Sequence, residues 1–379
     1  MSSTGHWRTV RKVALGIALG VLALVFTAVG MVVKAVFWSG IKDVGGDQIQ
    51  ALPPVPKVTL PGSQSVYVAL GDSYSAGEGV EPYMTGTQDA DEGGDRCHRS
   101  SDAYSQQMEF STPVVVRFRA CSGARIRDMY ATQTTSGGGS SLGPQLAPEV
   151  LGDDVGLVTL TIGGNDLGFA KVLHHCFTHR DCMNDEFDDS FDDGQKSGLR
   201  LREWAERRLG ELGEDMRTLF TRLRDGAPNS RILVLGYPNL LWSSWPDLLA
   251  KDCALDVLLL DGNEANEILE FQFRFDQLID ALSARTRVEF INTAPVFINH
   301  EPCGAVTPRW LDFIVPGDSR QNPLDPGTMH PNRNGHYVLS RVVACYLWQN
   351  PAPVDDYDGG DLKDCATHGK VDREPVVPR

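Results

Sequence analysis

A short apolar run followed by small polar residues constrains the fold of this chain more than any other stretch. Residues 66–70 (VYVAL) are apolar and end at Gly71, a pattern typical of a strand buried on both faces of a parallel sheet. Asp72 and Ser73 come next, so a serine lies just past the carboxyl end of that strand, where open α/β sheets carry their sites. With a base nearby, Ser73 is a candidate nucleophile. Taken alone, the pattern equally fits a turn in which Asp72 or Ser73 only caps a helix.

Apolar strands and amphipathic helices alternate along the rest of the chain. We expect strands at residues 114–118, 155–162, 231–235 and 288–291, and helices at residues 102–110, 199–223, 263–284 and 335–348. Such alternation predicts a three-layer α/β domain with a mainly parallel sheet over residues 65–348.

The N-terminal region contains an apolar segment, residues 13–33, without a charged side chain. As a helix it is long enough to cross a hydrocarbon core of roughly 30 Å. Basic residues precede it (Arg8, Arg11 and Lys12), so we expect residues 1–12 in the cytoplasm and the remainder outside, in a single-pass protein of the cell membrane. A cleaved signal peptide is the alternative, although its apolar region is usually shorter and ends at a small-residue cleavage site.

Two further segments flank the expected globular domain. Residues 39–62 contain several prolines and glycines, which predicts a semi-extended tether. Residues 349–379 are acidic and contain proline, and we expect them to form a surface tail.

The charge balance argues against some partners. The formal net charge is −15 and the isoelectric point is near 5.0, which disfavours nucleic acid or an anionic membrane surface as the main partner. We therefore expect no nucleic-acid partner.

The cysteines all lie after the apolar segment, at positions 97, 121, 176, 182, 253, 303, 345 and 365. An even number of cysteines in an exported region predicts disulfides, whose pairing the sequence alone leaves open. A zinc site is the alternative for one cluster, made of His174, His175, Cys176, His179 and Cys182. In an oxidising compartment we expect its two cysteines to pair with each other, and we expect no metal.

Four short motifs supply the groups that acyl transfer requires. They are GDSYS at 71–75, Gly123 after a strand, GGND at 163–166, and MHPNRNGH at 329–336. Acyl transfer needs a nucleophile, a base, and donors for the developing oxyanion. Ser73 supplies the nucleophile and His330 the base. The side-chain amide of Asn165, with the backbone N–H groups of Ser73 and Gly123, supplies the donors. This chemistry needs no cofactor.

With these motifs in this order, the sequence resembles the SGNH, or GDSL-type, hydrolase family over residues 65–348. The stretch 96–105 (RCHRSSDAYS) and the cysteine layout resemble its actinobacterial esterase and lipase branch. The resemblance implies a three-layer α/β/α fold, with Ser73 and His330 catalytic and Ser73, Gly123 and Asn165 forming the oxyanion hole. It also implies the disulfides Cys97–Cys121, Cys176–Cys182 and Cys253–Cys303, which leaves Cys345–Cys365 as the remaining pair.

The chain departs from the family pattern beside the histidine. The family usually has an aspartate three residues before it, where this chain has Gly327, and Asp325 is two residues too early. Some members of the branch use a backbone carbonyl instead, so this chain resembles an enzyme with a Ser–His dyad. We expect the carbonyl of Gly327 to hold the imidazole tautomer and Asp325 to be dispensable.

The resemblance and the apolar segment together predict a membrane-anchored extracytoplasmic serine esterase or lipase that acts on lipid or cell-envelope esters. A phospholipase or a carbohydrate deacetylase of the same family is the alternative within enzymes. A catalytically silent surface-binding domain is the alternative outside enzymes, and the presence of Ser73, Asn165 and His330 argues against it.

Overall fold

The computed structural model describes most of the chain after residue 51, all of it within the unit Asp47–Arg379. The described ranges are 52–89, 92–133, 142–190, 196–241, 262–301, 308–312, 325–353 and 362–369. The expected membrane segment, residues 13–33, lies outside them. Within these ranges, no helix combines the length and the apolar character that crossing a membrane requires.

The core is a five-stranded sheet in which every pairing is parallel. Its strands are β1 (Val66–Gly71), β2 (Val115–Phe118), β3 (Val155–Thr161), β4 (Arg231–Leu235) and β5 (Glu289–Ile291), in the spatial order β2-β1-β3-β4-β5. This order reverses direction between β1 and β3. Sheets of this kind bind ligands at the carboxyl ends of the strands beside such a switch point. The GDSYS motif follows β1 and GGND follows β3, so the fold brings both motifs to that edge.

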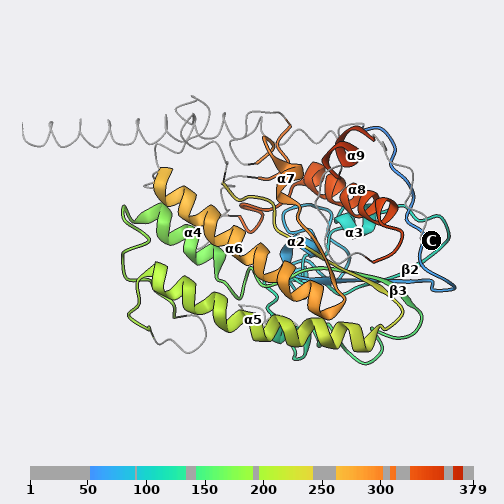
Figure 1. Ribbon diagram of the computed structural model, residues 1–379, viewed down its shortest axis with the longest axis horizontal. Coiled ribbons are helices and arrows are strands. Elements are labelled where there is room, and N and C mark those ends of the chain that lie inside the picture. Colours follow the sequence, from blue (N-terminus) through green and yellow to red (C-terminus); the bar gives the residue numbers. More distant parts are fainter. Residues whose placement is uncertain are drawn as a thin grey trace, which may run out of the picture. The chain divides into compact units, whose positions relative to one another are not determined.

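Helices cover both faces of the sheet, which confirms the expected three-layer α/β architecture (Figure 1). On one side α5 (Leu201–Gly226) lies beside α6 (Gly262–Thr286); on the other α3 (Tyr104–Gln107), α8 (Arg333–Gln349) and α9 (Leu362–His368) lie together. The remaining elements are α2 (Ser73–Ala76), the 3₁₀ helix η2 (Ile126–Met129), α4 (Phe169–Thr178) and α7 (Ala294–Phe297). The residues of β1, β3 and β4 are all buried, which explains why their sequences lack polar alternation.

Three regions differ from the expectations. The helix expected at 102–110 is reduced to the four residues of α3. The expected acidic tail contains α9, which packs on α8 and buries Leu362, Cys365 and Ala366. Residues 52–62 of the expected tether pack on the domain, because Val58 is buried and its backbone pairs with residues 109–111.

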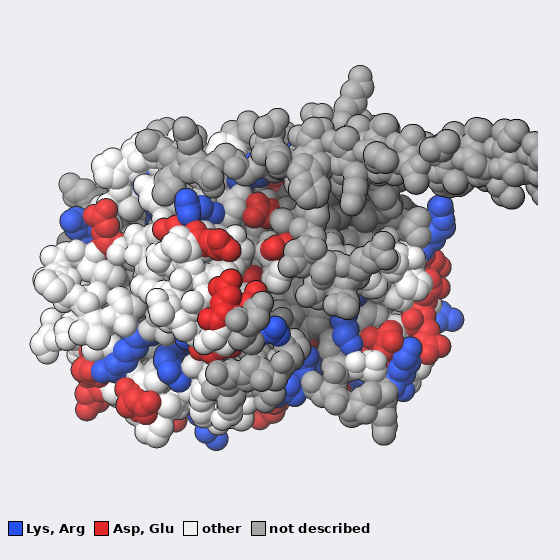
Figure 2. Space-filling view, turned by 180° about the vertical axis from the view of Figure 1, so that it is seen from behind, with Lys and Arg blue, Asp and Glu red and all other residues white. Residues whose placement is uncertain are grey.

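Acidic and basic side chains are interspersed on the face shown in Figure 2. On α5 and α6, ion pairs such as Arg202 with Glu267 at 2.8 Å and Arg208 with Glu211 at 3.1 Å involve side chains that are partly exposed to solvent. Exposed pairs contribute little to stability because water and salt screen them.

One ion pair is buried instead. Arg231 at the start of β4 donates from Nε to Glu289 of β5 at 2.5 Å, and its Nη1 donates to the carbonyl of Asn350 at 2.7 Å. The hydroxyl of Tyr346 on α8 donates to Glu289 at 3.1 Å. The pair therefore connects the edge of the sheet to the end of α8.

We predict that Arg231→Met lowers the free energy of unfolding by about 3–5 kcal/mol, because it leaves the Glu289 carboxylate buried without its cation. Urea denaturation of the full chain measures the change. Glu109→Gln, which removes the exposed partner of Lys57 (3.4 Å), is the control and should change stability by less than about 1 kcal/mol. Equal effects of the two substitutions would contradict a structural role for the buried pair.

Candidate active site

The nucleophile candidate lies on a tight turn at the end of β1. Asp72 is the N-cap of α2, and its carboxylate accepts a hydrogen bond from the Tyr74 N–H at 3.1 Å. The turn requires a glycine before it, because Gly71 has φ +119° and a Cβ there would lie 2.3 Å from the carbonyl oxygen of Thr161. Ser73 therefore begins α2 at the carboxyl edge of the sheet.

The Asp72 carboxylate fixes this turn to its neighbours. It accepts from the hydroxyl of Thr161 on β3 at 2.6 Å and from the phenol of Tyr237, which follows β4. Burial raises the pKa of Asp72 to about 6, although these hydrogen bonds oppose the rise. Ser75 adds a second connection, since its hydroxyl accepts from the Thr161 N–H at 2.9 Å.

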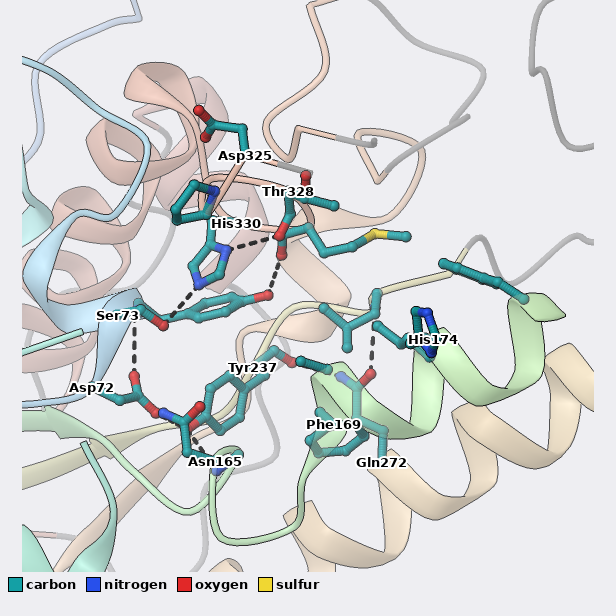
Figure 3. A pocket seen from close by; sticks show the side chains of 18 residues that line it. Asp72, Ser73, Asn165, Phe169, His174, Tyr237, Gln272, Asp325, Thr328 and His330 are labelled. Atoms are coloured by element: carbon teal, nitrogen blue, oxygen red, sulfur yellow. Dashed lines mark hydrogen bonds between the residues drawn. The ribbon is translucent and has the colours of Figure 1, made fainter. Parts of the chain in front are cut away.

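The structure places His330 against the serine (Figure 3). Its Nε2 lies 2.7 Å from Ser73 Oγ, and its Nδ1 lies 2.9 Å from the carbonyl oxygen of Thr328. A carbonyl only accepts, so Nδ1 carries the proton and Nε2 is left to accept from the serine hydroxyl. Burial lowers the pKa of His330, opposed by the Glu78 charge, the Thr328 carbonyl and the Asp325 charge, so the imidazole is neutral at pH 7. A neutral imidazole in this tautomer can act as a general base.

The carbonyl on the imidazole is that of Thr328, whereas we expected that of Gly327. The Gly327 carbonyl accepts from the backbone N–H of His330 at 3.0 Å and so closes the turn itself. The positive φ of Met329 (+62°) then reverses the chain between Thr328 and His330. Asp325 accepts from the Gly327 N–H at 2.7 Å, so its carboxylate stabilises the same turn while Nδ1 pairs with Thr328.

The two expected oxyanion partners differ in their position relative to the cavity that Ser73 lines. Asn165 lines the same cavity as Ser73, and its Nδ2 donates to the carbonyl of Ala124 at 3.0 Å, which orients the amide. Gly123 has φ +75° in the adjoining turn and is not part of the cavity wall that the described residues form. The bond from Asn165 to Ala124 connects this turn to the GGND loop.

A cavity of about 290 Å³ opens beside the serine. Figure 3 shows the Ser73–His330 pair on one side of it and α4, with Phe169 and His174, on the other. Apolar side chains dominate the wall on the α4 side: Phe169, Ala170, Leu173 and Phe177, with Leu240 near them. The sequence interpretation missed α4, although its apolar residues recur at helical spacing. It also missed Tyr74 and Tyr237, which line the cavity. Their rings pack edge to face with the ring centroids 5.0 Å apart.

Disulfides connect segments near the cavity. The structure contains Cys97–Cys121, Cys176–Cys182 and Cys345–Cys365, whereas the expected Cys253–Cys303 pair lies outside the described residues. Cys97–Cys121 fixes the loop before Gly123, and Cys176–Cys182 closes the end of α4. The zinc alternative fails at that second pair, because both of its sulfurs are bonded to each other. Among the described residues, no group of three or more His, Cys, Asp or Glu side chains is placed to hold a metal ion.

A serine hydroxyl bonded to an oriented, neutral imidazole at the switch point of a parallel sheet is the arrangement that serine-dependent hydrolases use. The sequence model of the GDSL-like Lipase/Acylhydrolase family matches residues 69–338. The chain belongs to this family of carboxylic ester hydrolases.

Relatives agree with this assignment. A lipase of Streptomyces rimosus is 33% identical over 275 residues, which are 71% of this chain and 81% of the lipase. Lipase 1 of Streptomyces coelicolor is 29% identical over 222 residues, which are 56% of this chain and 65% of that protein. The crystal structure of phospholipase A1 from Streptomyces albidoflavus NA297 matches with a TM-score of 0.51 at 25% identity, covering 72% of this chain and 94% of that one.

We predict that Gly79→Ala lowers ester hydrolysis by roughly 10- to 100-fold, because small misplacements of reacting groups are costly. Gly79 has φ +82°, and a Cβ there would lie 2.7 Å from the Cα of Gly327, so the substitution pushes the histidine turn away from Ser73. Initial rates on p-nitrophenyl butyrate measure the effect.

The matched control is Gly86→Ala. Gly86 has a similar φ of +84°, but nothing lies within 4 Å of an added Cβ. Both substitutions strain the backbone by about 1–2 kcal/mol, and thermal unfolding measures this loss of stability. We expect Gly86→Ala to keep the parental rate of ester hydrolysis. A similar loss of activity in both variants would mean that backbone strain alone explains the result.

Proposed function

We propose that this protein is a serine esterase or lipase that uses a Ser73–His330 dyad. The single observation that carries the proposal is the hydrogen-bond chain from Ser73 Oγ to His330 Nε2 (2.7 Å) and from Nδ1 to the Thr328 carbonyl (2.9 Å). A catalytically silent binding domain has no use for this orientation of the imidazole.

The reaction follows from the protonation states. His330 takes the proton from Ser73 as Oγ attacks the ester carbonyl, and the imidazolium is held by the Thr328 carbonyl. The N–H groups of Ser73 and Gly123 and the amide of Asn165 stabilise the tetrahedral oxyanion. His330 then returns the proton to the leaving alcohol, and water, activated by the same imidazole, hydrolyses the acyl-enzyme.

The apolar wall that α4 gives to the cavity supports the proposal that an apolar acyl group of the substrate binds there. The cavity volume of about 290 Å³ is near the lower end of ligand pockets, which are roughly 300–1,000 Å³. A phospholipase is the second candidate, because one of the matching solved structures is that of a phospholipase A1.

We also propose that residues 13–33 anchor the chain in the cell membrane with the hydrolase domain outside. The support is the uncharged apolar segment and the basic residues Arg8, Arg11 and Lys12 before it. An anchored enzyme would meet lipid or cell-envelope esters.

The full chain, purified in detergent with its disulfides formed, should hydrolyse p-nitrophenyl esters, and Ser73→Ala and His330→Ala should each lose at least about 10²–10⁴-fold in kcat. The dependence of the rate on acyl length, from acetate to palmitate, separates an esterase from a lipase. The release of fatty acid from phosphatidylcholine identifies a phospholipase. A fluorophosphonate probe should label Ser73. A folded protein that neither turns over esters nor reacts with the probe would refute the proposal.

We predict that Asp325→Asn retains activity within about tenfold of the parent, far from the loss in His330→Ala. The asparagine Oδ1 can still accept from the Gly327 N–H, so the turn that carries the Thr328 carbonyl is kept. Steady-state kinetics on p-nitrophenyl butyrate decide the point. A loss as large as that of His330→Ala, in a variant with parental thermal stability, would show a catalytic triad.

A further inference from the structure

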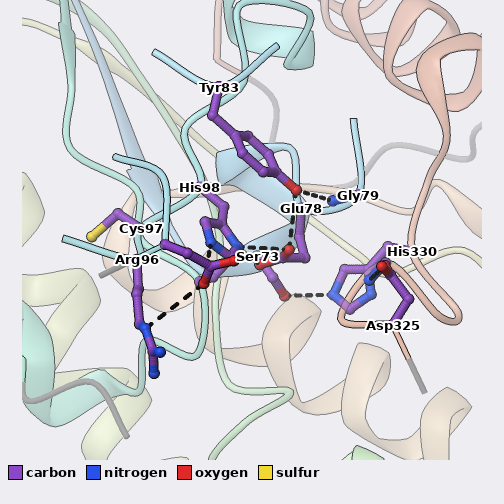
Figure 4. Close-up of polar contacts among 12 residues, drawn as sticks. Ser73, Glu78, Gly79, Tyr83, Arg96, Cys97, His98, Asp325 and His330 are labelled. Carbon is purple, nitrogen blue, oxygen red and sulfur yellow. Dashed lines mark hydrogen bonds and ion pairs between the residues drawn. The ribbon is translucent and has the colours of Figure 1, made fainter. Parts of the chain in front are cut away.

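A buried carboxylate lies near the Ser73–His330 pair, on the segment that follows α2. Glu78, just after α2, is 4% exposed. Both of its oxygens lie 2.8 Å from Nδ1 of His98, and the phenol of Tyr83 donates to it at 3.2 Å. Figure 4 shows this carboxylate between the His98 ring and the Ser73–His330 pair.

The cluster is rigid because each member is held twice. The rings of Tyr83 and His98 are stacked, with their centroids 4.6 Å apart and an interplanar angle of 9°. Tyr83 also accepts from the Gly79 N–H at 2.9 Å. His98 adjoins Cys97, whose disulfide to Cys121 ties the loop down, and its Nε2 lies 3.4 Å from Asp89.

The charge state of the cluster is also defined. Burial raises the pKa of Glu78, but the hydrogen bond and the charge of His98 outweigh it and leave that pKa below its ordinary value. Burial lowers the pKa of His98, but Glu78 and Asp89 outweigh it and raise that pKa. Glu78 is therefore an ionised carboxylate at neutral pH.

Other titratable groups lie near His330 on several elements. They are Asp72 at the N-cap of α2, Tyr74 on α2, Tyr237 after β4, His336 on α8, Asp325 in the histidine turn, Asp312 in the adjoining loop, and His174 across the cavity. Asp72 is engaged by three donors, with its pKa raised to about 6. Asp325 is only half-buried, so water screens its charge. Glu78 combines burial with full ionisation.

We propose that Glu78, held by His98 and Tyr83, is a positioning residue that supplies the negative charge favouring the His330 imidazolium, the part that a carboxylate on Nδ1 would play in a triad. The inference rests on the proposed dyad mechanism. The contact of Gly79 with Gly327 gives the same segment a mechanical role, since it holds the histidine turn at its distance from Ser73. The charge of Glu78 acts on His330 through buried protein, where it is poorly screened.

The test is Glu78→Gln in the full chain, which keeps an acceptor for His98 and Tyr83 but removes the charge. Without that charge the pKa of His330 falls, so the acid limb of the kcat/KM profile moves to lower pH. The imidazolium is also less stable in the transition state, so kcat falls roughly tenfold with KM little changed.

The matched control is Asp89→Asn, which removes the half-exposed carboxylate on the far side of His98. It should leave both kcat and the acid limb unchanged. If Glu78 had only a structural role, Glu78→Gln would lower kcat and thermal stability without moving the limb, and that result would overturn the inference. Parental kinetics in Glu78→Gln would overturn it as well.

A second variant covers the case in which Glu78→Gln does not fold. His98→Gln removes the charge that keeps the pKa of Glu78 low, so buried Glu78 takes up a proton over the acid limb and no longer favours the imidazolium. The pKa of His330 then falls, and the acid limb of the kcat/KM profile moves to lower pH, as in Glu78→Gln. An unchanged acid limb contradicts the inference. Failure of the proposed function looks different, because the parent chain would then show no turnover that depends on Ser73, and both proposals would fall together.

Discussion

The hydrogen bonds to the buried Asp72 carboxylate are the interaction on which the site depends. The three donors come from α2, from β3 and from the loop after β4, so one side chain fixes three neighbouring segments around the nucleophile. A buried carboxylate is costly unless its oxygens are paired, which makes this arrangement specific rather than adaptable. The parallel sheet brings the segments to one edge, and Asp72 sets their spacing at that edge.

In the proposed Ser73–His330 dyad, the orientation of the imidazole and the stability of its protonated form depend on different groups. A backbone carbonyl orients the imidazole as well as a carboxylate does, but it carries no net charge. Burial of His330 further disfavours its protonated form. An ionised group elsewhere favours the imidazolium that forms during the reaction, and the proposed role of Glu78 is to supply that charge from the segment after α2.

Much of the fold and part of the site could be predicted from the sequence. Strands buried on both faces are continuous apolar runs, so β1, β3 and β4 were recognisable, and Ser73, Asn165 and His330 stood in recognisable motifs. The Thr328 carbonyl was missed because its direction depends on the positive φ of Met329, which no residue pattern indicates. The pairing of Glu78 with His98 was missed because it depends on how two loops fold against each other across twenty residues.

The position of α4 separates two properties that in many enzymes share residues. The groups of the dyad come from α2 and the turn before α8, whereas Phe169, Leu173 and Phe177 form successive steps along one face of α4. The disulfide Cys176–Cys182 closes that helix independently of the dyad. Under the proposed function, substitutions on this face alter which acyl groups fit while Ser73 and His330 keep their places. The acyl selectivity and the reactivity of Ser73 would then depend on different elements of the fold, so each could change without the other.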